Sequence, residues 1–81
     1  MAYMSQEGYD KLVAQLKEME TIERPAASAA IAEARDKGDL SENSEYDAAK
    51  EHQAMLEMKI NQLKAVIGDA KIIDTSKLKA D

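Results

Sequence analysis

The sequence predicts an all-α protein, a long antiparallel two-helix coiled-coil hairpin with a short extended C-terminal tail. Two stretches of the 81-residue chain carry apolar residues at alternating spacings of three and four, the repeat of helices that pack along one face. Gly38 lies between the two stretches. The chain contains no Trp, Phe or Cys, and helix-forming residues dominate it. For so short a chain, regular packing of helix on helix is one of the few ways to stay folded alone.

The first helix is expected to begin near Gln6. Ser5 is a suitable N-cap, and Glu7 lies in the first turn, where the helix dipole favours a negative charge. Spacings of three, four and three then mark one packed face, formed by Tyr9, Leu12, Leu16 and Met19.

Pro25 interrupts this repeat. Proline has no backbone N–H and its ring crowds the preceding turn, so it either kinks a helix or separates two helices. Helical composition resumes directly after it, which favours the kink. Six alanines follow between positions 26 and 34, and such small side chains allow a partner helix to approach closely. We therefore expect the distal half of the hairpin to be thin.

The chain is expected to reverse direction at Gly38. Lys37 suits a helix C-terminus, and glycine suits the left-handed position just beyond it. A turn of about five residues then leads to a second helix and folds the two arms together. Gly68 is expected to end that helix as its C′ residue, and each arm spans roughly 40 Å at 1.5 Å per residue. The packed face of the second helix consists of Tyr46, Ala49, Gln53, Leu56, Ile60, Leu63 and Ile67.

Beyond Gly68 the helical repeat stops. Residues 71–74 are typical of a short strand or an extended linker, and the polar residues after them have no period. The predicted organisation is therefore a hairpin domain over residues 1–74, with its tip near residues 36–46. Residues 75–81 are expected to be a linker.

Charge and composition exclude several classes of function. A net charge of −5 argues against sequence-specific binding to a DNA duplex, which needs an excess of Lys and Arg. Without Cys there is no disulfide framework and no thiolate metal site. No stretch has the apolar length of a membrane span, and the N-terminus does not resemble a secretory signal. These observations favour a cytoplasmic protein that does not associate with membranes, and the two packed faces joined at Gly38 favour a monomer.

The acidic residues at the tip can be interpreted in two ways, as helix caps or as metal ligands. Asp39 and Glu42 have the D-x-x-E spacing of a capping box, as N-cap and N3 of the second helix. The same spacing puts two ionised carboxylates on one side of a helical turn, where they can complete a Mg²⁺ sphere if other ligands are supplied. Leu40, between them, is either tucked under the turn or an insertion point for a partner.

Three other residues near the tip are candidates for function. Tyr46 is most simply the last core layer under the tip. Arg35 and Lys50 lie one on each arm, and each is either an ordinary solvated charge or a contact to a phosphate backbone.

Residues 31–49 read IAEARDKGDLSENSEYDAA and resemble the tip signature of the Gre family of bacterial transcript cleavage factors, most closely the GreA type. The family pattern is I-A-E-A-R, two residues, G-D-L-x-E-N-x-E-Y, one residue, A-A, and every fixed position is kept. The Arg24-Pro25 pair and the Ile73-Asp74 segment also fit, so the resemblance covers nearly the whole chain.

The resemblance implies a function and a partner. Gre factors insert their coiled coil through the secondary channel of bacterial RNA polymerase and reach its active site after backtracking. The residues matching Asp39 and Glu42 then help to hold a second Mg²⁺ and a water, and the polymerase cleaves its own nascent RNA near the 3′ end. By this resemblance the chain is no enzyme alone, binds no cofactor tightly, and shares Mg²⁺ with the polymerase.

The resemblance also implies roles for other residues and a second domain. Basic residues that match Arg35 and Lys50 approach the extruded RNA, although Lys50 stands where the family has arginine and loses its planar contacts. Gly38, Leu40, Asn43 and Tyr46 would support the tip. Gre factors continue into an FKBP-like domain, so residues 75–81 would lead toward it. The alternative function is a module that occupies the channel and modulates or inhibits the polymerase without promoting cleavage. A third, a generic dimerising coiled coil, is disfavoured by the intrachain hairpin.

Overall fold

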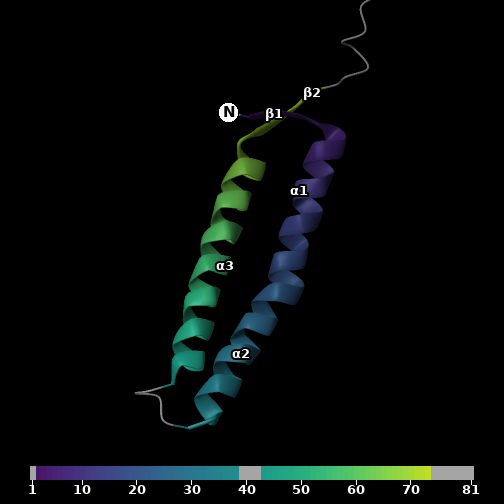
Figure 1. Cartoon of the computed structure of the whole chain (residues 1–81). Coiled ribbons are helices and arrows are strands. Elements are labelled where there is room, and N and C mark those ends of the chain that lie inside the picture. The colour runs from purple at the N-terminus through teal and green to yellow at the C-terminus, as the bar shows by residue number, and fades with distance from the viewer. Residues whose placement is uncertain (1, 39–42, 74–81) are drawn as a thin grey trace, which may run out of the picture.

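The protein is a helical hairpin whose open end is closed by a small sheet (Figure 1). The computed structural model describes residues 2–38 and 43–73. The first arm runs through α1 (Gln6–Glu18), a π-helical turn η1 (Met19–Glu23) and α2 (Arg24–Asp36). The second arm is α3 (Ser44–Gly68), whose 25 residues span about 37 Å at the usual helical rise. The predicted all-α hairpin is confirmed.

The start of the first arm is also confirmed. The backbone N–H of Gly8 donates to the Ser5 hydroxyl at 3.0 Å, so Ser5 caps α1, which begins at Gln6. This bond satisfies one of the N–H groups that a helix leaves without a partner at its start.

The core lies along the line where the two arms meet. Its buried members are Met19, Ala27, Leu56, Ile60 and Leu63, and Ile60 is fully buried. Leu12, Leu16 and Ile67 are partly buried and pack against this cluster. These residues include most of both predicted packed faces, so the spacing of apolar residues identified the surfaces that meet.

Pro25 lies within a continuous helical arm, as the kink interpretation predicted. It occupies the first turn of α2, directly after a π-helical turn. The five residues before α2 form the π-turn, and the N–H of Arg24 donates to the carbonyl of Met19. Figure 1 shows the first arm changing direction where α1 gives way to α2. The sequence predicted a bend at this point and did not predict the π-turn.

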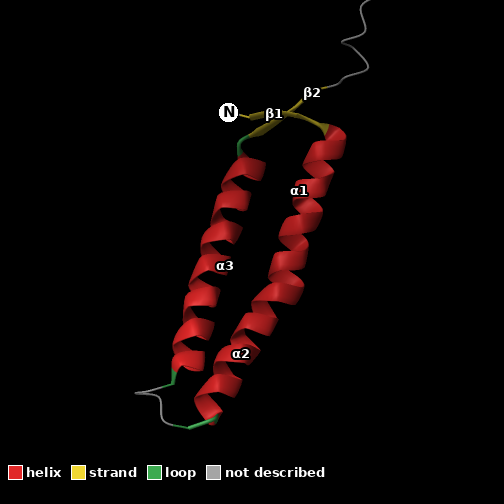
Figure 2. Ribbon diagram, in the orientation of Figure 1, coloured by secondary structure: helices red, strands yellow, loops and turns green. Residues whose placement is uncertain are grey.

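A strand at the N-terminus was missed by the sequence analysis. β1 (Ala2–Ser5) pairs in parallel with β2 (Ala70–Ile73), with Tyr3 opposite Lys71 and Met4 opposite Ile72. The predicted strand reading of the C-terminal segment is confirmed within residues 70–73. Figure 2 shows the two strands crossing the open end of the hairpin, above both arms.

The end of α3 differs from the prediction. The helix runs through Gly68, and Asp69 is its C-cap with φ −100°, so Gly68 is the last helical residue and not the C′ residue. Its φ is not positive, because the chain leaves α3 directly into β2 without a left-handed residue. Gly38 does have a positive φ, +133°, as its place beyond the first arm predicted.

Two ion pairs join the arms at the π-turn, one from a residue within it and one from the residue that follows it. The guanidinium of Arg24 donates two hydrogen bonds of 2.8 Å to the carboxylate of Glu57. The ammonium of Lys64 lies 3.1 Å from the carboxylate of Glu20. The hydrogen bonds from Arg24 lower the pKa of Glu57, and the same contact raises the pKa of Arg24.

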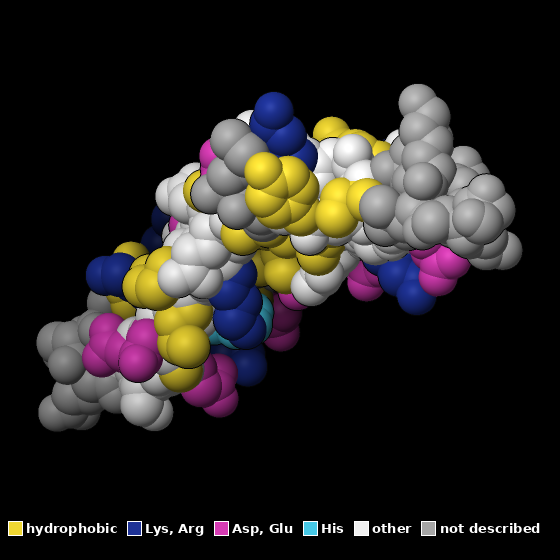
Figure 3. Space-filling model, turned by 90° about the horizontal axis from the view of Figure 1, so that it is seen from above, with side chains coloured by type: hydrophobic (Ala, Val, Ile, Leu, Met, Phe, Trp, Pro, Cys, Tyr) yellow, Lys and Arg dark blue, Asp and Glu magenta, His cyan; other side chains and the backbone are white. Residues whose placement is uncertain are grey.

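Charged and apolar side chains are distributed unevenly at the open end. Seen from above, hydrophobic side chains gather in the middle of that end, with charged side chains around them (Figure 3). Tyr3 and Ile72, one from each strand, are exposed there. No helix in the described part of the chain is long and apolar enough to cross a membrane.

Candidate functional site at the hairpin tip

The two ends of the tip segment are described by the structure, and its centre is not. Asp39, Leu40 and Glu42 lie outside the described residues, so their predicted contacts with a metal ion or a partner stay predictions. Gly38 on one side and Asn43 on the other are described. The described part of the site is its base, which we call the tip base: the end of α2 with Lys37 and Gly38, and Asn43 with the first turn of α3.

Asn43 connects the two arms at this base. Its side-chain oxygen accepts a hydrogen bond from the N–H of Tyr46 at 3.1 Å, which makes it the N-cap of α3. Its side-chain amide donates to the carbonyl of Ala34 at 2.6 Å, across to the last turns of α2. One side chain thus begins the second helix and holds it against the first.

This finding corrects the predicted capping box. The box required Asp39 as N-cap and Glu42 as N3, but α3 begins at Ser44 and its N-cap is Asn43. Both Asn and Asp are strong N-cap residues, and local sequence does not decide which of two such residues begins a helix. Here the choice follows the bond between Asn43 and Ala34, because an amide can cap one helix and donate to the other, whereas an ionised carboxylate can only accept.

An ion pair provides a second connection across the base. The ammonium of Lys37 lies 3.0 Å from a carboxylate oxygen of Glu45, and both side chains are more than half exposed. The hydrogen bond to Glu45, with its charge, raises the pKa of Lys37. The sequence analysis used Lys37 only as a helix end and missed this pair. The sequence did contain a signal for it, because a basic residue ends the first arm and an acidic residue lies in the first turn of the second arm.

The predicted basic residues occupy the two arms near the base. Arg35 is exposed in the last turn of α2. Lys50 lies on α3, with its ammonium 4.9 Å from the centre of the Tyr46 ring, which is within the range of a cation–π contact. Tyr46 itself is half-buried. The Tyr46 ring therefore holds the Lys50 ammonium beside the first turn of α3.

A small cavity of about 240 Å³ lies between the arms behind the base. Its lining residues are Ala30, Glu33, Ala34, Lys37, Glu45 and Ala49. Half of them are alanines. Small side chains keep this half of the hairpin narrow, and Figure 1 shows the arms converging toward the turn.

The family of the chain can be assigned from its sequence. Residues 2–72 match the family described as "Transcription elongation factor, N-terminal", which covers GreA and GreB. The chain belongs to this family. It is 55% identical over 78 residues to transcription elongation factor GreA of Christiangramia forsetii and 56% identical to GreA of Flavobacterium psychrophilum. Each alignment covers 96% of the chain and 49% of the relative.

More distant members of the family match over the same region. GreA of Rhodospirillum rubrum is 49% identical over 78 residues, which are 96% of this chain and 50% of that protein. The chain thus spans about half the length of the curated relatives it matches. The part of this chain that matches its relatives, residues 2–72 in the family match, includes the tip base where the two arms are joined.

The donor chemistry at the tip suits Mg²⁺ only in part. Asp39 and Glu42 are carboxylates, the ligand type that Mg²⁺ prefers, but two carboxylates leave most of its six positions to other ligands. Among the described residues no group of three His, Cys, Asp or Glu side chains is placed to hold a metal ion. Asp39 and Glu42 themselves lie outside those residues, so metal binding at the tip stays a prediction.

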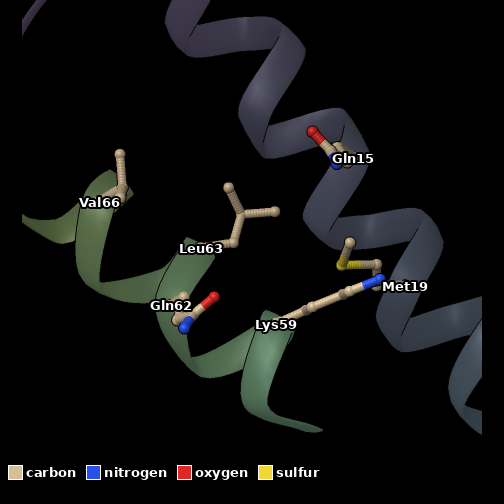
Figure 4. Close-up of a pocket in the computed structure, with 6 residues that line it drawn as sticks. All are labelled: Gln15, Met19, Lys59, Gln62, Leu63 and Val66. Carbon is tan, nitrogen blue, oxygen red and sulfur yellow. The ribbon is translucent and has the colours of Figure 1, made fainter. Parts of the chain in front are cut away.

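A larger cavity lies away from the tip, between α1 and α3. Its volume is about 370 Å³, and Leu63 and Met19 contribute apolar surface to it (Figure 4). Gln15 comes from the first arm, while Lys59, Gln62 and Val66 come from α3. It is an open groove on the shaft and contains none of the predicted site residues.

Proposed function

We propose that this GreA-type domain stimulates the cleavage of nascent RNA by bacterial RNA polymerase, by placing Asp39 and Glu42 in the polymerase active site. The proposal rests on family membership together with the position of the two acids. In sequence, both lie between Gly38 and Asn43, the two described ends of the tip segment. The observation that carries it is that the arms are joined directly at this base, by Asn43 and by the Lys37–Glu45 pair.

The acids would act as ligands completed by the partner. Together with groups of the polymerase and water they would hold one Mg²⁺, which when bound supplies Lewis-acid activation of water and of the leaving oxygen. The chain itself contributes negative charge and orientation. It is therefore proposed to stimulate a nuclease activity that belongs to the polymerase, and not to be an enzyme alone.

The basic residues would orient the RNA. Arg35 and Lys50 lie on opposite arms of the base, so a phosphate backbone that passes the tip could contact both. The contact between Lys50 and the Tyr46 ring restricts the ammonium, which lowers the conformational entropy lost when it meets a phosphate. The narrow, alanine-rich end of the hairpin suits entry into a confined channel.

The experiment is an RNA cleavage assay on backtracked bacterial polymerase complexes. Because the chain spans half of its relatives, it is tested alone and fused to the C-terminal half of the GreA of Flavobacterium psychrophilum. Asp39→Asn and Glu42→Gln remove charge and keep size, and Asp47→Asn, on an exposed acid of α3, is the matched control. Cleavage is expected to be lost in the first two fusions and kept in the control.

Binding is measured in the same preparations. The proposal expects the Asp39→Asn fusion to bind polymerase with unchanged affinity. Normal cleavage by that fusion would show that Asp39 holds no metal. A parent fusion that binds, blocks elongation and never promotes cleavage would instead favour the alternative function, a module that only occupies the channel.

A further inference from the structure

The first arm changes its inward-facing line of residues at the π-turn. In α1 that line consists of Tyr9, Leu12, Leu16 and Met19, and in α2 it consists of Arg24, Ala27, Ile31 and Ala34, all buried or half-buried. Within each line the spacing is three or four. Between Met19 and Arg24 it is five, which is one residue more than the repeat allows.

An uninterrupted α-helix would turn other residues inward. Continuing the α1 line at spacings of four, three, four and three leads to Glu23, Ala26, Ala30 and Glu33, and all four are exposed. An unbroken helix would thus place two glutamates against α3 and expose Ala27 and Ala34, which are 3% and 5% exposed in the structure. The chain carries one residue too many for a single helix to face α3 along its whole length.

We infer that the π-turn is a register correction of one residue, which lets both halves of the first arm face α3. A π-turn closes its hydrogen bond over five residues instead of four, so it accommodates one extra residue without breaking the helix. The bond from the N–H of Arg24 to the carbonyl of Met19 has this span. Ile22, within the turn, is 63% exposed, as expected for a residue displaced outward.

Two ion pairs at the turn fit this interpretation. Glu20 pairs with Lys64 inside the turn, and Arg24 pairs with Glu57 at the residue that follows it. The contact between Arg24 and Glu57 needs the corrected register. A shift of one residue would rotate α2 by about 100° relative to α1 and separate Arg24 from Glu57. The turn thereby sets the rotation of α2, and with it the rotation of the tip base relative to the open end.

Pro25 is the competing cause of the π-turn. Proline disturbs the turn before it, and it follows this turn by two residues. The two causes make different predictions for a chain without the proline. If the extra residue requires the turn, Pro25→Ala keeps it, and only deletion of a residue at the turn removes it.

The test compares three variants of the 81-residue chain that all carry Pro25→Ala, so that no proline interrupts a restored helix. The first has no other change, the second also lacks Ile22, and the third also lacks Ala14, an exposed residue of α1. Deleting Ile22 returns the inward line to even spacings of three and four. Deleting Ala14 shortens the arm equally but moves Leu16 and Met19 out of register.

Hydrogen bonding across residues 19–24 is read by NMR, and stability by thermal melting. We expect the π-turn to persist in Pro25→Ala. The Ile22 deletion is expected to give an unbroken α-helix with a melting temperature at or above that of Pro25→Ala, and the Ala14 deletion to melt several degrees lower. A regular α-helix through residues 19–24 in Pro25→Ala, or equal melting of the two deletions, would overturn the inference. None of these readouts depends on the proposed function.

Discussion

Asn43 offers the sharpest test of how the tip base is held together, through its replacement by alanine. The substitution removes an N-cap, which costs about 0.5–2 kcal/mol of the free energy of unfolding. It also removes the 2.6 Å bond to the carbonyl of Ala34, worth about 0.5–1.5 kcal/mol. That carbonyl still accepts from the N–H of Lys37 at 3.2 Å, so no orphaned acceptor adds to the cost. The total is roughly 1–3.5 kcal/mol.

Thermal melting followed by circular dichroism measures this loss. For a domain of this size, each kcal/mol lowers the melting temperature by about 4–8 °C. Asn43→Asp separates the two contributions, because aspartate caps as well as asparagine but cannot donate to the carbonyl of Ala34. It is expected to melt between the parent and Asn43→Ala. Ser44→Ala, at the exposed first residue of α3, is the matched control.

The reasoning fails if Asn43→Ala melts within a degree or two of the parent. It also fails in part if Asn43→Asp matches the parent, because the bond between the arms would then contribute nothing. Either result would mean that the packing of the two arms alone sets the geometry of the tip base.

Three further predictions follow from the core, the ion pair and the acids. Ile60→Ala, at the fully buried core position, is expected to lower the free energy of unfolding by about 2–5 kcal/mol, whereas Met58→Ala, at a 58% exposed site, should change it little in urea titrations. The lowered pKa of Glu57 means that its ion pair stabilises the fold above its usual pKa of 4.5 and loses this effect as pH falls through the lower folded value. The melting temperature should therefore fall less steeply between pH 5 and about 3 in Glu57→Gln than in the parent; equal slopes would contradict this. Titration calorimetry of the chain alone should reveal no micromolar Mg²⁺ site, because Asp39 and Glu42 leave most of the metal's positions to water. For the same reason the chain alone should not cleave RNA. A micromolar site would contradict the proposed sharing of the metal.

The hairpin could be predicted because its signals are local. Residues at spacings of three and four lie on one face of a helix whatever follows in the chain, so Leu56, Ile60 and Leu63 could be assigned to the core in advance. The cap at Ser5 and the positive φ of Gly38 are likewise properties of one or two turns. The motif that resembles the Gre tip could be read in the same way, since it is a continuous run of residues.

The errors fall where one segment depends on another. A strand of four residues at the N-terminus has no distinctive pattern of its own, and β1 forms because β2 returns beside it after the whole hairpin. The capping box was placed at Asp39 because the contact that selects Asn43 comes from Ala34 on the other arm. The count of five between Met19 and Arg24 was visible in the sequence, but its meaning required knowing which residues of α2 are buried.

The amino-acid sequence by itself determined two helical arms, the face on which each is apolar, the reversal at Gly38 and the acidic tip motif. Each of these depends on backbone geometry and on residues within a few positions of one another. Only the tertiary structure decided the parallel pairing of β1 with β2, the residue that begins α3, and the π-turn that corrects the register of the first arm. Those features are set by contacts between residues far apart in the chain, where α3 selects the face that the first arm must present.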